Sequence, residues 1–313
     1  MKKLLSVLPA LLLLCGCAAK PVPKTDMRLS VVASAFPEWD FARIVAGEYA
    51  DVVLLLKPGA EPHSYEPSPQ DILRIEQADI FIYGGGESDE WITRILESGS
   101  SSERQVLSLM DCVSLREEEI QAFMTSKDEE ASDEAEYDEH VWTSPKNAAR
   151  IVRSVCTLLC EADAAHAESY QANAEAYLSK LDALDASFSA LAAEAERKLL
   201  VFGDRFPFLY LVREYGLDYA AAFPGCSDAT DVNPSTVAHL IDVIRNENIP
   251  VVFRCDLSSG AIADTLSEAT GAKVLTLYSC HTVSQTDFLN GESYLSLMER
   301  NLSALKEALN GCR

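Results

Sequence analysis

Three of the five histidines in the sequence stand in short polar segments with no helical pattern of their own. His63 lies in KPGAEPHSYEPSP, His140 in YDEHVWTSP and His281 in YSCHT. Neutral imidazole is a common ligand of zinc, and three imidazoles with one oxygen form a tetrahedral zinc set. The sequence therefore predicts one metal site made of His63, His140 and His281, although each alone would be an ordinary loop histidine.

The segment around His63 is stiffened by proline at positions 58, 62, 67 and 69. Proline fixes its own φ and restricts the preceding residue to extended conformations. Rigid loops on a scaffold tend to carry binding residues, so we expect His63 to be the first ligand. His166 and His239 instead fall within segments of helical pattern, and we expect neither at the site.

Short apolar runs alternate with amphipathic segments along most of the chain. The runs predict strands at residues 29–34, 52–56, 80–83, 198–202, 219–223, 251–253 and 274–277. The amphipathic segments predict helices at residues 36–48, 69–77, 91–97, 145–161, 164–197, 206–215, 237–246, 262–270 and 294–309. Strand–helix alternation indicates parallel sheets, whose ligands bind at the carboxyl ends of the strands. His63 and His281 each follow a strand and so fall at that edge.

This pattern predicts an α/β fold in two lobes joined by one long helix. We expect an N-terminal lobe over residues 28–164, a long connecting helix over 165–197 and a C-terminal lobe over 198–313. A helix of that length would extend about 45 Å. Residues 117–139 are rich in Asp and Glu, and we expect them to form a solvated loop of the first lobe.

The formal net charge of −23 argues against nucleic-acid binding and favours a cationic partner such as a metal ion. The chain begins MKKLLSVLPALLLLCGC, which has the form of a secretory signal peptide. Its end resembles a bacterial lipobox, so we expect removal of residues 1–16, lipidation of Cys17 and a tether over residues 17–27. A plain signal peptide is the alternative.

Export places the remaining cysteines in an oxidising compartment. Cys226 and Cys280 both follow strand-like runs of the second lobe, and we expect a disulfide between them; two separate buried thiols are the alternative. Cys156 and Cys160 are four residues apart on one expected helix, where a role in the core or in pairing elsewhere is favoured over a metal pair.

Several segments together resemble a known family. These are KPGAEPHSYEPSPQDI, DEHVWTSPKNA, the long connecting helix, FPFLYLVREYGL, DVNPSTVAHLIDVI, GAKVLTLY and SYLSLMERNLSALKEAL. Over almost the whole mature chain, the sequence resembles the cluster A-I metal-binding solute-binding lipoproteins of ABC importers. This resemblance implies two lobes joined by one rigid helix and a metal bound between them.

The sequence departs from that family at two positions. In that family, the third ligand is a His or Glu that stands three residues before an aromatic residue. The matching aromatic residue in this sequence is Phe208, and the residue three positions before it is Arg205. Guanidinium has no lone pair to offer a cation. The family's fourth ligand, usually a carboxylate, corresponds to His281. We therefore expect His281 to be recruited and Arg205 to pair with Asp204, Glu61 or Asp138, leaving water or one of these acids as fourth ligand.

The function implied is capture of Zn²⁺ outside the cytoplasmic membrane, by a monomer, and delivery to an ABC permease. Mn²⁺ is the less favoured cargo, because manganese receptors share the scaffold. No catalysis is expected, since no HExxH-type helix is present. The rival hypotheses are a degenerate site without metal, a surface adhesion protein on the same scaffold, and a zinc hydrolase. If the three histidines have the usual pKa of about 6.5, they become protonated below about pH 6, and zinc binding should weaken there.

Overall fold

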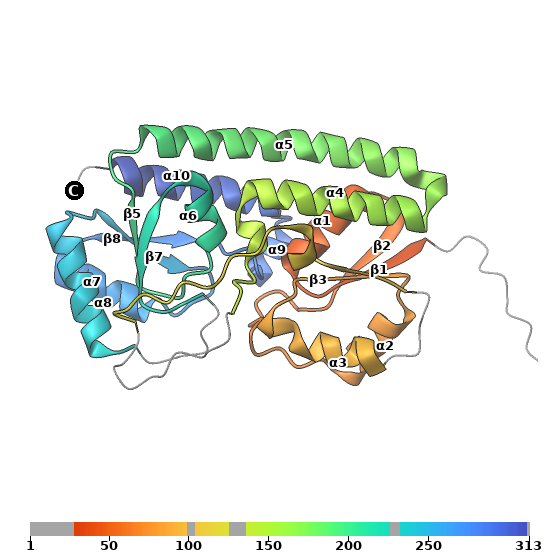
Figure 1. Cartoon of the computed structure of the whole chain (residues 1–313), viewed down its shortest axis with the longest axis horizontal. Helices are drawn as coiled ribbons and strands as arrows, with labels where there is room; N and C mark the ends of the chain where they lie inside the picture. The colour runs from red at the N-terminus through yellow and green to blue at the C-terminus, as the bar shows by residue number, and fades with distance from the viewer. Residues whose placement is uncertain (1–27, 99–103, 125–135, 226–231, 312–313) are drawn as a thin grey trace, which may run out of the picture.

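Two parallel four-stranded sheets form the centres of two lobes (Figure 1). The computed structural model describes residues 28–98, 104–124, 136–225 and 232–311. The first sheet has the order β2–β1–β3–β4, with β1 (Leu29–Ala33), β2 (Ala50–Leu54), β3 (Ile80–Tyr83) and β4 (Gln105–Ser108). The second has the order β6–β5–β7–β8, with β5 (Leu199–Phe202), β6 (Asp218–Ala221), β7 (Val251–Cys255) and β8 (Lys273–Leu277). The predicted α/β fold in two lobes is confirmed.

Helices cover both faces of the first sheet. The helices are α1 (Phe36–Ala46) and α4 (Pro145–Ala162) on one face, and α2 (Pro69–Gln77) and α3 (Glu90–Ser98) on the other. Successive residues of a strand point to opposite faces, so Val31 packs with α1 and α4 while Val32 packs with α2 and α3. The strand β1 is therefore apolar on both sides, as its sequence indicates.

The second lobe is built in the same way. Its helices are α7 (Pro234–Asn246) and α8 (Ala261–Thr270) on one face, and α6 (Leu209–Tyr215) and α10 (Tyr294–Asn310) on the other. Val201 and Val252 face α7 and α8, whereas Phe202 and Phe253 face α6 and α10. The short helix α9 (Gln285–Leu289) precedes α10. Single 3₁₀ turns are η1 (Glu87–Asp89), η2 (Met110–Cys112), η3 (Val141–Thr143) and η4 (Ala164–His166).

The long helix α5 (Ala167–Glu194) extends over both lobes (Figure 1). Its 28 residues span about 42 Å. It packs on α4 and α1 of the first lobe and on α10 and α6 of the second. The buried side chains along it belong to one continuous core that includes residues of both lobes, among them Tyr170 and Phe188. The lobes therefore share part of their core.

The start of α10 makes a second connection between the lobes. The Tyr294 hydroxyl donates a hydrogen bond to the Trp142 carbonyl at 2.7 Å, and the Tyr294 N–H donates to Asp40 at 2.9 Å. Trp142 precedes α4 and Asp40 lies in α1. Both bonds are buried, where a hydrogen bond left unmade would cost about 1–3 kcal/mol. The two lobes are thus joined at more than the connecting helix.

The described part of the acidic segment differs from the prediction. Residues 116–124, which we call the crossing segment, leave the first lobe and lie along the second (Figure 1). Gln121 donates to the Tyr219 carbonyl at 2.7 Å, the Phe123 carbonyl accepts from Thr236 at 2.6 Å, and Glu119 forms an ion pair with Arg213. The expectation of a solvated loop of the first lobe is wrong here, because Glu119, Gln121 and Phe123 all have partners in the second lobe. Residues 125–135 lie outside the described part.

Several predicted helix starts are confirmed by their capping residues. Ser68 and Asp71 form a capping box at α2, and the Ser144 side chain accepts the Asn147 N–H at α4. Proline follows each cap at the first helical position. Neither β4 nor α9, which are four and five residues long, is predicted from the sequence. Among the described helices, none has the length and apolar character to cross a membrane.

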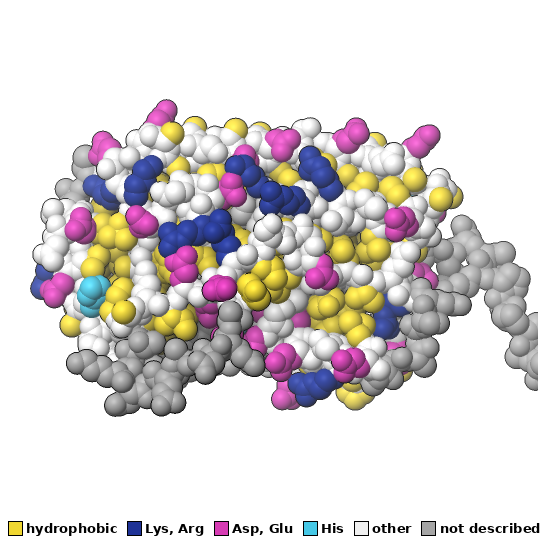
Figure 2. Space-filling model, in the orientation of Figure 1, with side chains coloured by type: hydrophobic (Ala, Val, Ile, Leu, Met, Phe, Trp, Pro, Cys, Tyr) yellow, Lys and Arg dark blue, Asp and Glu magenta, His cyan; other side chains and the backbone are white. Residues whose placement is uncertain are grey.

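Charged side chains of both signs lie on the face shown in Figure 2. Most of the basic ones are in the upper half of the view, and acidic ones lie among and below them.

Candidate metal centre

Each of the three predicted histidines lies at the carboxyl end of its sheet or on a loop folded against it. His63 is in the loop between β2 and α2, where its backbone N–H donates to Glu61 at 3.3 Å. The same loop is tied to the second lobe, since the Gly59 N–H donates to the Val283 carbonyl at 2.8 Å. The proline-rich loop therefore connects directly to the chain that follows His281.

His140 is held immediately before α4. Its ring Nδ1 lies 3.0 Å from an Asp138 carboxylate oxygen, which also accepts the His140 backbone N–H at 2.7 Å. A carboxylate at Nδ1 favours the tautomer with the proton on Nδ1 and the lone pair on Nε2. The Asp138 carbonyl accepts a hydrogen bond from the Tyr210 hydroxyl of α6 at 2.9 Å. The second lobe thus helps to fix this ligand loop.

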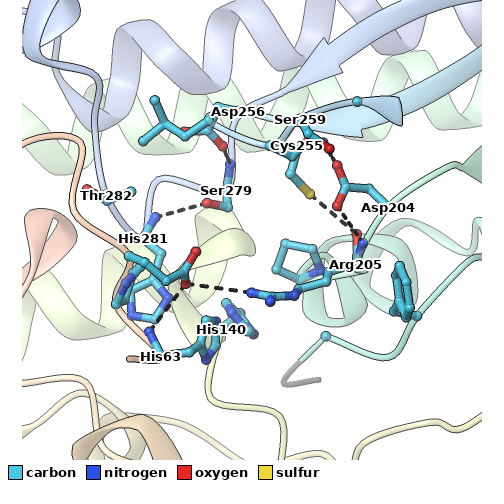
Figure 3. A pocket seen from close by; sticks show the side chains of 18 of the residues that line it. His63, His140, Asp204, Arg205, Cys255, Asp256, Ser259, Ser279, His281 and Thr282 are labelled. Atoms are coloured by element: carbon cyan, nitrogen blue, oxygen red, sulfur yellow. Dashed lines mark hydrogen bonds and ion pairs between the residues drawn. The ribbon is translucent and has the colours of Figure 1, made fainter. Parts of the chain in front are cut away.

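His281 follows β8 in a tightly fixed turn. Cys280 has φ of 58°, the Ser279 N–H donates to Asp256 at 2.7 Å, and the Ser279 carbonyl accepts from the Trp142 indole at 2.9 Å. The His281 ring is buried, and its Nδ1 has no hydrogen-bond partner among the described residues. A buried polar atom of this kind is uncommon, and the His281 ring lies beside those of His63 and His140 (Figure 3).

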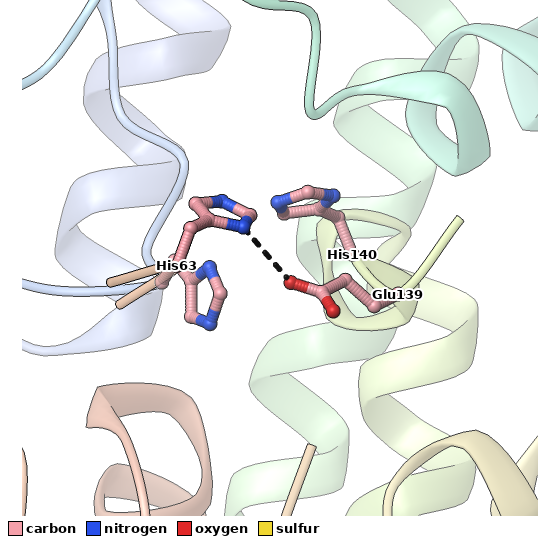
Figure 4. Close-up of side chains that lie close together, drawn as sticks. His63, Glu139 and His140 are labelled. Atoms are coloured by element: carbon pink, nitrogen blue, oxygen red, sulfur yellow. Dashed lines mark ion pairs between the residues drawn. The ribbon is translucent and has the colours of Figure 1, made fainter. Parts of the chain in front are cut away.

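The three rings converge on one point. Their centroids are 5.6 Å apart for His63 and His140, 5.3 Å for His63 and His281, and 5.3 Å for His140 and His281. One donor atom from each of them, with one carboxylate oxygen of Glu139, lies within 4.8 Å of all the others (Figure 4). Donors around tetrahedral zinc are about 3.3 Å apart, so this set is slightly wider than a closed site.

Glu139 is the residue that the sequence reasoning missed. Its carboxylate lies 3.5 Å from His63 Nδ1 and accepts hydrogen bonds from the Ser88 hydroxyl at 2.6 Å and the Ser88 N–H at 3.1 Å. Ser88 also lies 2.7 Å from His63 Nδ1. Its position next to His140 was a signal in the sequence that Glu139 could bind the metal, but from this segment only Asp138 was expected as a possible acidic ligand.

The charge states of the histidines differ. Burial, followed by the charges of His140 and Arg205, lowers the pKa of His63 to about 3. Burial, with the charges of His63 and His140, lowers the pKa of His281 well below its usual value. Burial would also lower the pKa of His140, but the Asp138 carboxylate outweighs it and raises that pKa. At neutral pH, His63 and His281 are therefore neutral and have a lone pair available.

Two further carboxyl groups are buried behind Glu139. Glu38 is fully buried and neither of its oxygens has a hydrogen-bond partner among the described residues. Burial, with the nearby charge of Asp89, raises its pKa well above the usual range. Burial also raises the pKa of Asp89 to about 7, although its carboxylate accepts the Gly85 N–H at 2.9 Å. The acids behind the site therefore favour their neutral forms.

The predicted supporting acids take different positions. The Arg205 guanidinium lies 3.6 Å from Glu61, which confirms one of the expected pairings. Asp204 instead accepts the backbone N–H groups of Arg205 at 2.9 Å and Cys255 at 3.0 Å. Of the three acids considered, Asp138 is the one that contacts a histidine ring.

The expectation of a disulfide at Cys280 is wrong. Cys280 is a free, fully buried thiol in the shared core, and its sulfur faces the Tyr278 carbonyl at 3.7 Å. Cys226 lies outside the described residues.

The two histidines that were expected away from the site are indeed elsewhere. The His166 ring stacks on Tyr49 with a centroid distance of 4.4 Å, and the His239 ring stacks on Phe123 with a centroid distance of 4.2 Å.

Comparison with known proteins gives a consistent picture. The zinc-binding lipoprotein AdcA of Streptococcus pneumoniae serotype 4 is 31% identical over 308 residues, which are 98% of this chain and 61% of that protein. The high-affinity zinc uptake system protein ZnuA of Bacillus subtilis is 28% identical over 282 residues, which are 90% of this chain and 88% of that protein. The chain thus spans about three fifths of the pneumococcal relative.

A solved structure has the same fold. The zinc-bound ZnuA-like domain of Streptococcus pneumoniae AdcA matches with a TM-score of 0.76 at 28% identity, and the match covers 91% of this chain and all of that domain. The family described as ZnuA, zinc-uptake complex component A, periplasmic, matches residues 31–308. The chain therefore belongs to the ZnuA family of zinc-uptake binding components.

Proposed function

We propose that this protein captures Zn²⁺ outside the cytoplasmic membrane and delivers it to an ABC permease. The observation that carries this proposal is the convergence of His63, Glu139, His140 and His281 within 4.8 Å, from loops of both lobes. Three imidazoles and one carboxylate are a donor set that zinc prefers. Mn²⁺ favours more oxygen ligands, so it is the less suitable cargo.

The comparisons support the same function. Both sequence relatives described above are named for zinc binding or zinc uptake, and the matching domain was solved with zinc bound. The family consists of solute-binding components rather than enzymes. An adhesion protein with a lost metal site would have no need for neutral, buried histidines that face one another.

The proposal includes the anchor and the division into lobes. After removal of residues 1–16, lipidation of Cys17 would hold a monomer at the outer face of the cytoplasmic membrane. Residues 17–27 would form the tether. All of these residues lie outside the described part. The lobes of residues 28–164 and 198–313, on either side of the connecting helix at 165–197, would each contribute ligands. His63, Glu139 and His140 come from the first lobe and His281 from the second.

Measurement of zinc affinity by competition with a chromophoric chelator tests this proposal. The change His63→Ala removes one of four donors, so we expect the affinity to fall by at least 100-fold, since even changes outside the ligand set typically cost 10–100-fold. His239→Ala is the matched control, because His239 stacks on Phe123 away from the site. Equal affinities of the His63→Ala and unsubstituted proteins would refute the assignment.

A further inference from the structure

The cavity at the metal centre is much larger than a metal ion requires. It has a volume of about 490 Å³ and extends from the histidines along the second lobe to the start of α8 (Figure 3). One water molecule takes up about 30 Å³ of liquid, and pockets for small organic molecules begin at about 300 Å³. The cavity thus has room for a small molecule beside the ion.

A permanent positive charge lies in this cavity beside the metal donors. The Arg205 guanidinium points toward His140 and His63, and its charge contributes to the lowered pKa of His63 (Figure 3). Its described ion pair, to Glu61, is 3.6 Å long, which exceeds a hydrogen-bond distance. The Glu61 side chain is 53% exposed, and its carboxylate also accepts the His63 N–H at 3.3 Å. The fork of N–H donors on Arg205 is therefore available to another anion.

The opposite wall of the cavity also offers donors. Residues 258–261, at the start of the ten-residue helix α8, line it. The Ser258 hydroxyl is buried and has no hydrogen-bond partner among the described residues. The first N–H groups of a helix favour a negatively charged group. Arg205 and Ser258 thus both line one cavity; the Ser258 hydroxyl has no hydrogen-bond partner among the described residues, and the ion pair of Arg205 with Glu61 is longer than a hydrogen bond.

We propose that this cavity binds a small chelating carboxylate together with the metal, so that the cargo is a metal–carboxylate complex. This inference rests on the proposed zinc site. One carboxylate of the anion would bind Arg205 through paired hydrogen bonds, which suit guanidinium geometry, while another oxygen reaches the zinc as an additional ligand. The remaining polar groups of the anion would face Ser258 and the start of α8.

The proposal explains why a cation is tolerated next to a cation site. A dication bound at the histidines is repelled by Arg205, and an anion between them removes that repulsion. Metal and anion should therefore strengthen each other's binding by the same factor. Citrate is a suitable probe, because it has three carboxylates and binds divalent metals.

Native mass spectrometry and calorimetry with citrate test the inference on the zinc-loaded protein, dialysed free of excess zinc. We expect a complex of protein, zinc and citrate, and weaker citrate binding to metal-free protein. Arg205→Gln should weaken citrate binding about tenfold or more, the usual scale for a charge-assisted hydrogen bond. The same change should raise the affinity for zinc alone, because it removes a charge that repels the bound dication. Arg28→Gln is the control, because it removes the same charge at an exposed position outside the cavity lining.

The outcomes separate the two proposals. Zinc binding without any ternary complex, or with citrate bound equally by the Arg205→Gln and unsubstituted proteins, would overturn the carboxylate site and leave the zinc receptor intact. Failure of the unsubstituted protein to bind zinc would overturn the receptor itself. If Arg205→Gln does not fold, Ser258→Ala provides the same readout. We expect that variant to weaken citrate binding several-fold, and unchanged citrate binding by it would overturn the site.

Discussion

His140 differs from the other two histidines in what holds it. The Asp138 carboxylate contacts both its ring and its backbone N–H, and this contact raises its pKa, whereas burial lowers the pKa values of His63 and His281. Three ordinary histidines would all compete with protons for the metal near pH 6.5. The structure corrects that expectation, because only His140 retains its proton there.

The pH dependence of zinc affinity should therefore reflect the protons of His140 and Glu139. Metal binding displaces a proton from His140 below its raised pKa and from Glu139, whose pKa is raised by burial, but none from His63 or His281, whose folded pKa values lie far lower. We expect the logarithm of the association constant to rise with pH with a slope between about one and two over about pH 5 to 6, and to level off above the pKa of His140.

Competition titrations over that pH range measure the slope. The change Asp138→Asn removes the carboxylate that raises the pKa of His140. The pH above which zinc affinity no longer rises should therefore be lower in this variant. Asp204→Asn is the control, because Asp204 contacts backbone N–H groups rather than a ring. A slope of about three would mean that His63 or His281 titrates as an ordinary histidine, in addition to His140 and Glu139.

At the scale of elements, the helix α6 holds the loop that carries Glu139 and His140, although α6 itself provides none of the four metal-binding side chains. The Tyr210 hydroxyl of α6 donates to the Asp138 carbonyl at 2.9 Å and accepts the Arg116 N–H at 3.0 Å. It thus connects the start of the crossing segment to the residues before His140. The Tyr210 side chain is buried, so water does not readily replace these contacts.

The change Tyr210→Phe should reveal this connection. It removes one hydroxyl and leaves one buried and one part-buried backbone group without that partner, which should lower the free energy of unfolding by about 1–3 kcal/mol. Zinc affinity should also decrease, because the loop that carries Glu139 and His140 is less firmly held. Tyr65→Phe is a suitable control, since its hydroxyl bonds Asp71 near the start of α2.

Denaturant unfolding and zinc competition provide the two measurements. Equal stability of the Tyr210→Phe and unsubstituted proteins would show that the hydroxyl does not hold the loop. A loss of stability with unchanged zinc affinity would show that the connection acts on the fold alone.

At the scale of the whole molecule, the lobes do not have separate cores. Side chains from the first sheet, α5 and the second sheet belong to one buried cluster, which includes Val31, Phe188 and Phe253. The Tyr294 bonds and the crossing segment add polar connections between the lobes. Unfolding of one lobe alone would expose much of the shared core to water, which is unfavourable.

The metal-free protein should therefore unfold in one cooperative transition. Differential scanning calorimetry should give a calorimetric enthalpy equal to the van't Hoff enthalpy. Two resolved transitions, or a calorimetric enthalpy well above the van't Hoff value, would indicate that the lobes unfold independently. Removal of zinc by a chelator before the scan avoids stabilisation by the ligand.

The sequence by itself determined the strand–helix alternation, the helix starts at residues 69 and 145, and the three histidines, because these depend on local periodicity and residue chemistry. Only the tertiary structure decided which acid completes the donor set. Asp138 and Glu139 are adjacent in sequence, but Asp138 contacts His140 while Glu139 reaches His63 and Ser88. The path of the crossing segment was likewise decided by contacts between residues distant in the sequence. Such contacts depend on how the lobes pack, which local patterns do not specify.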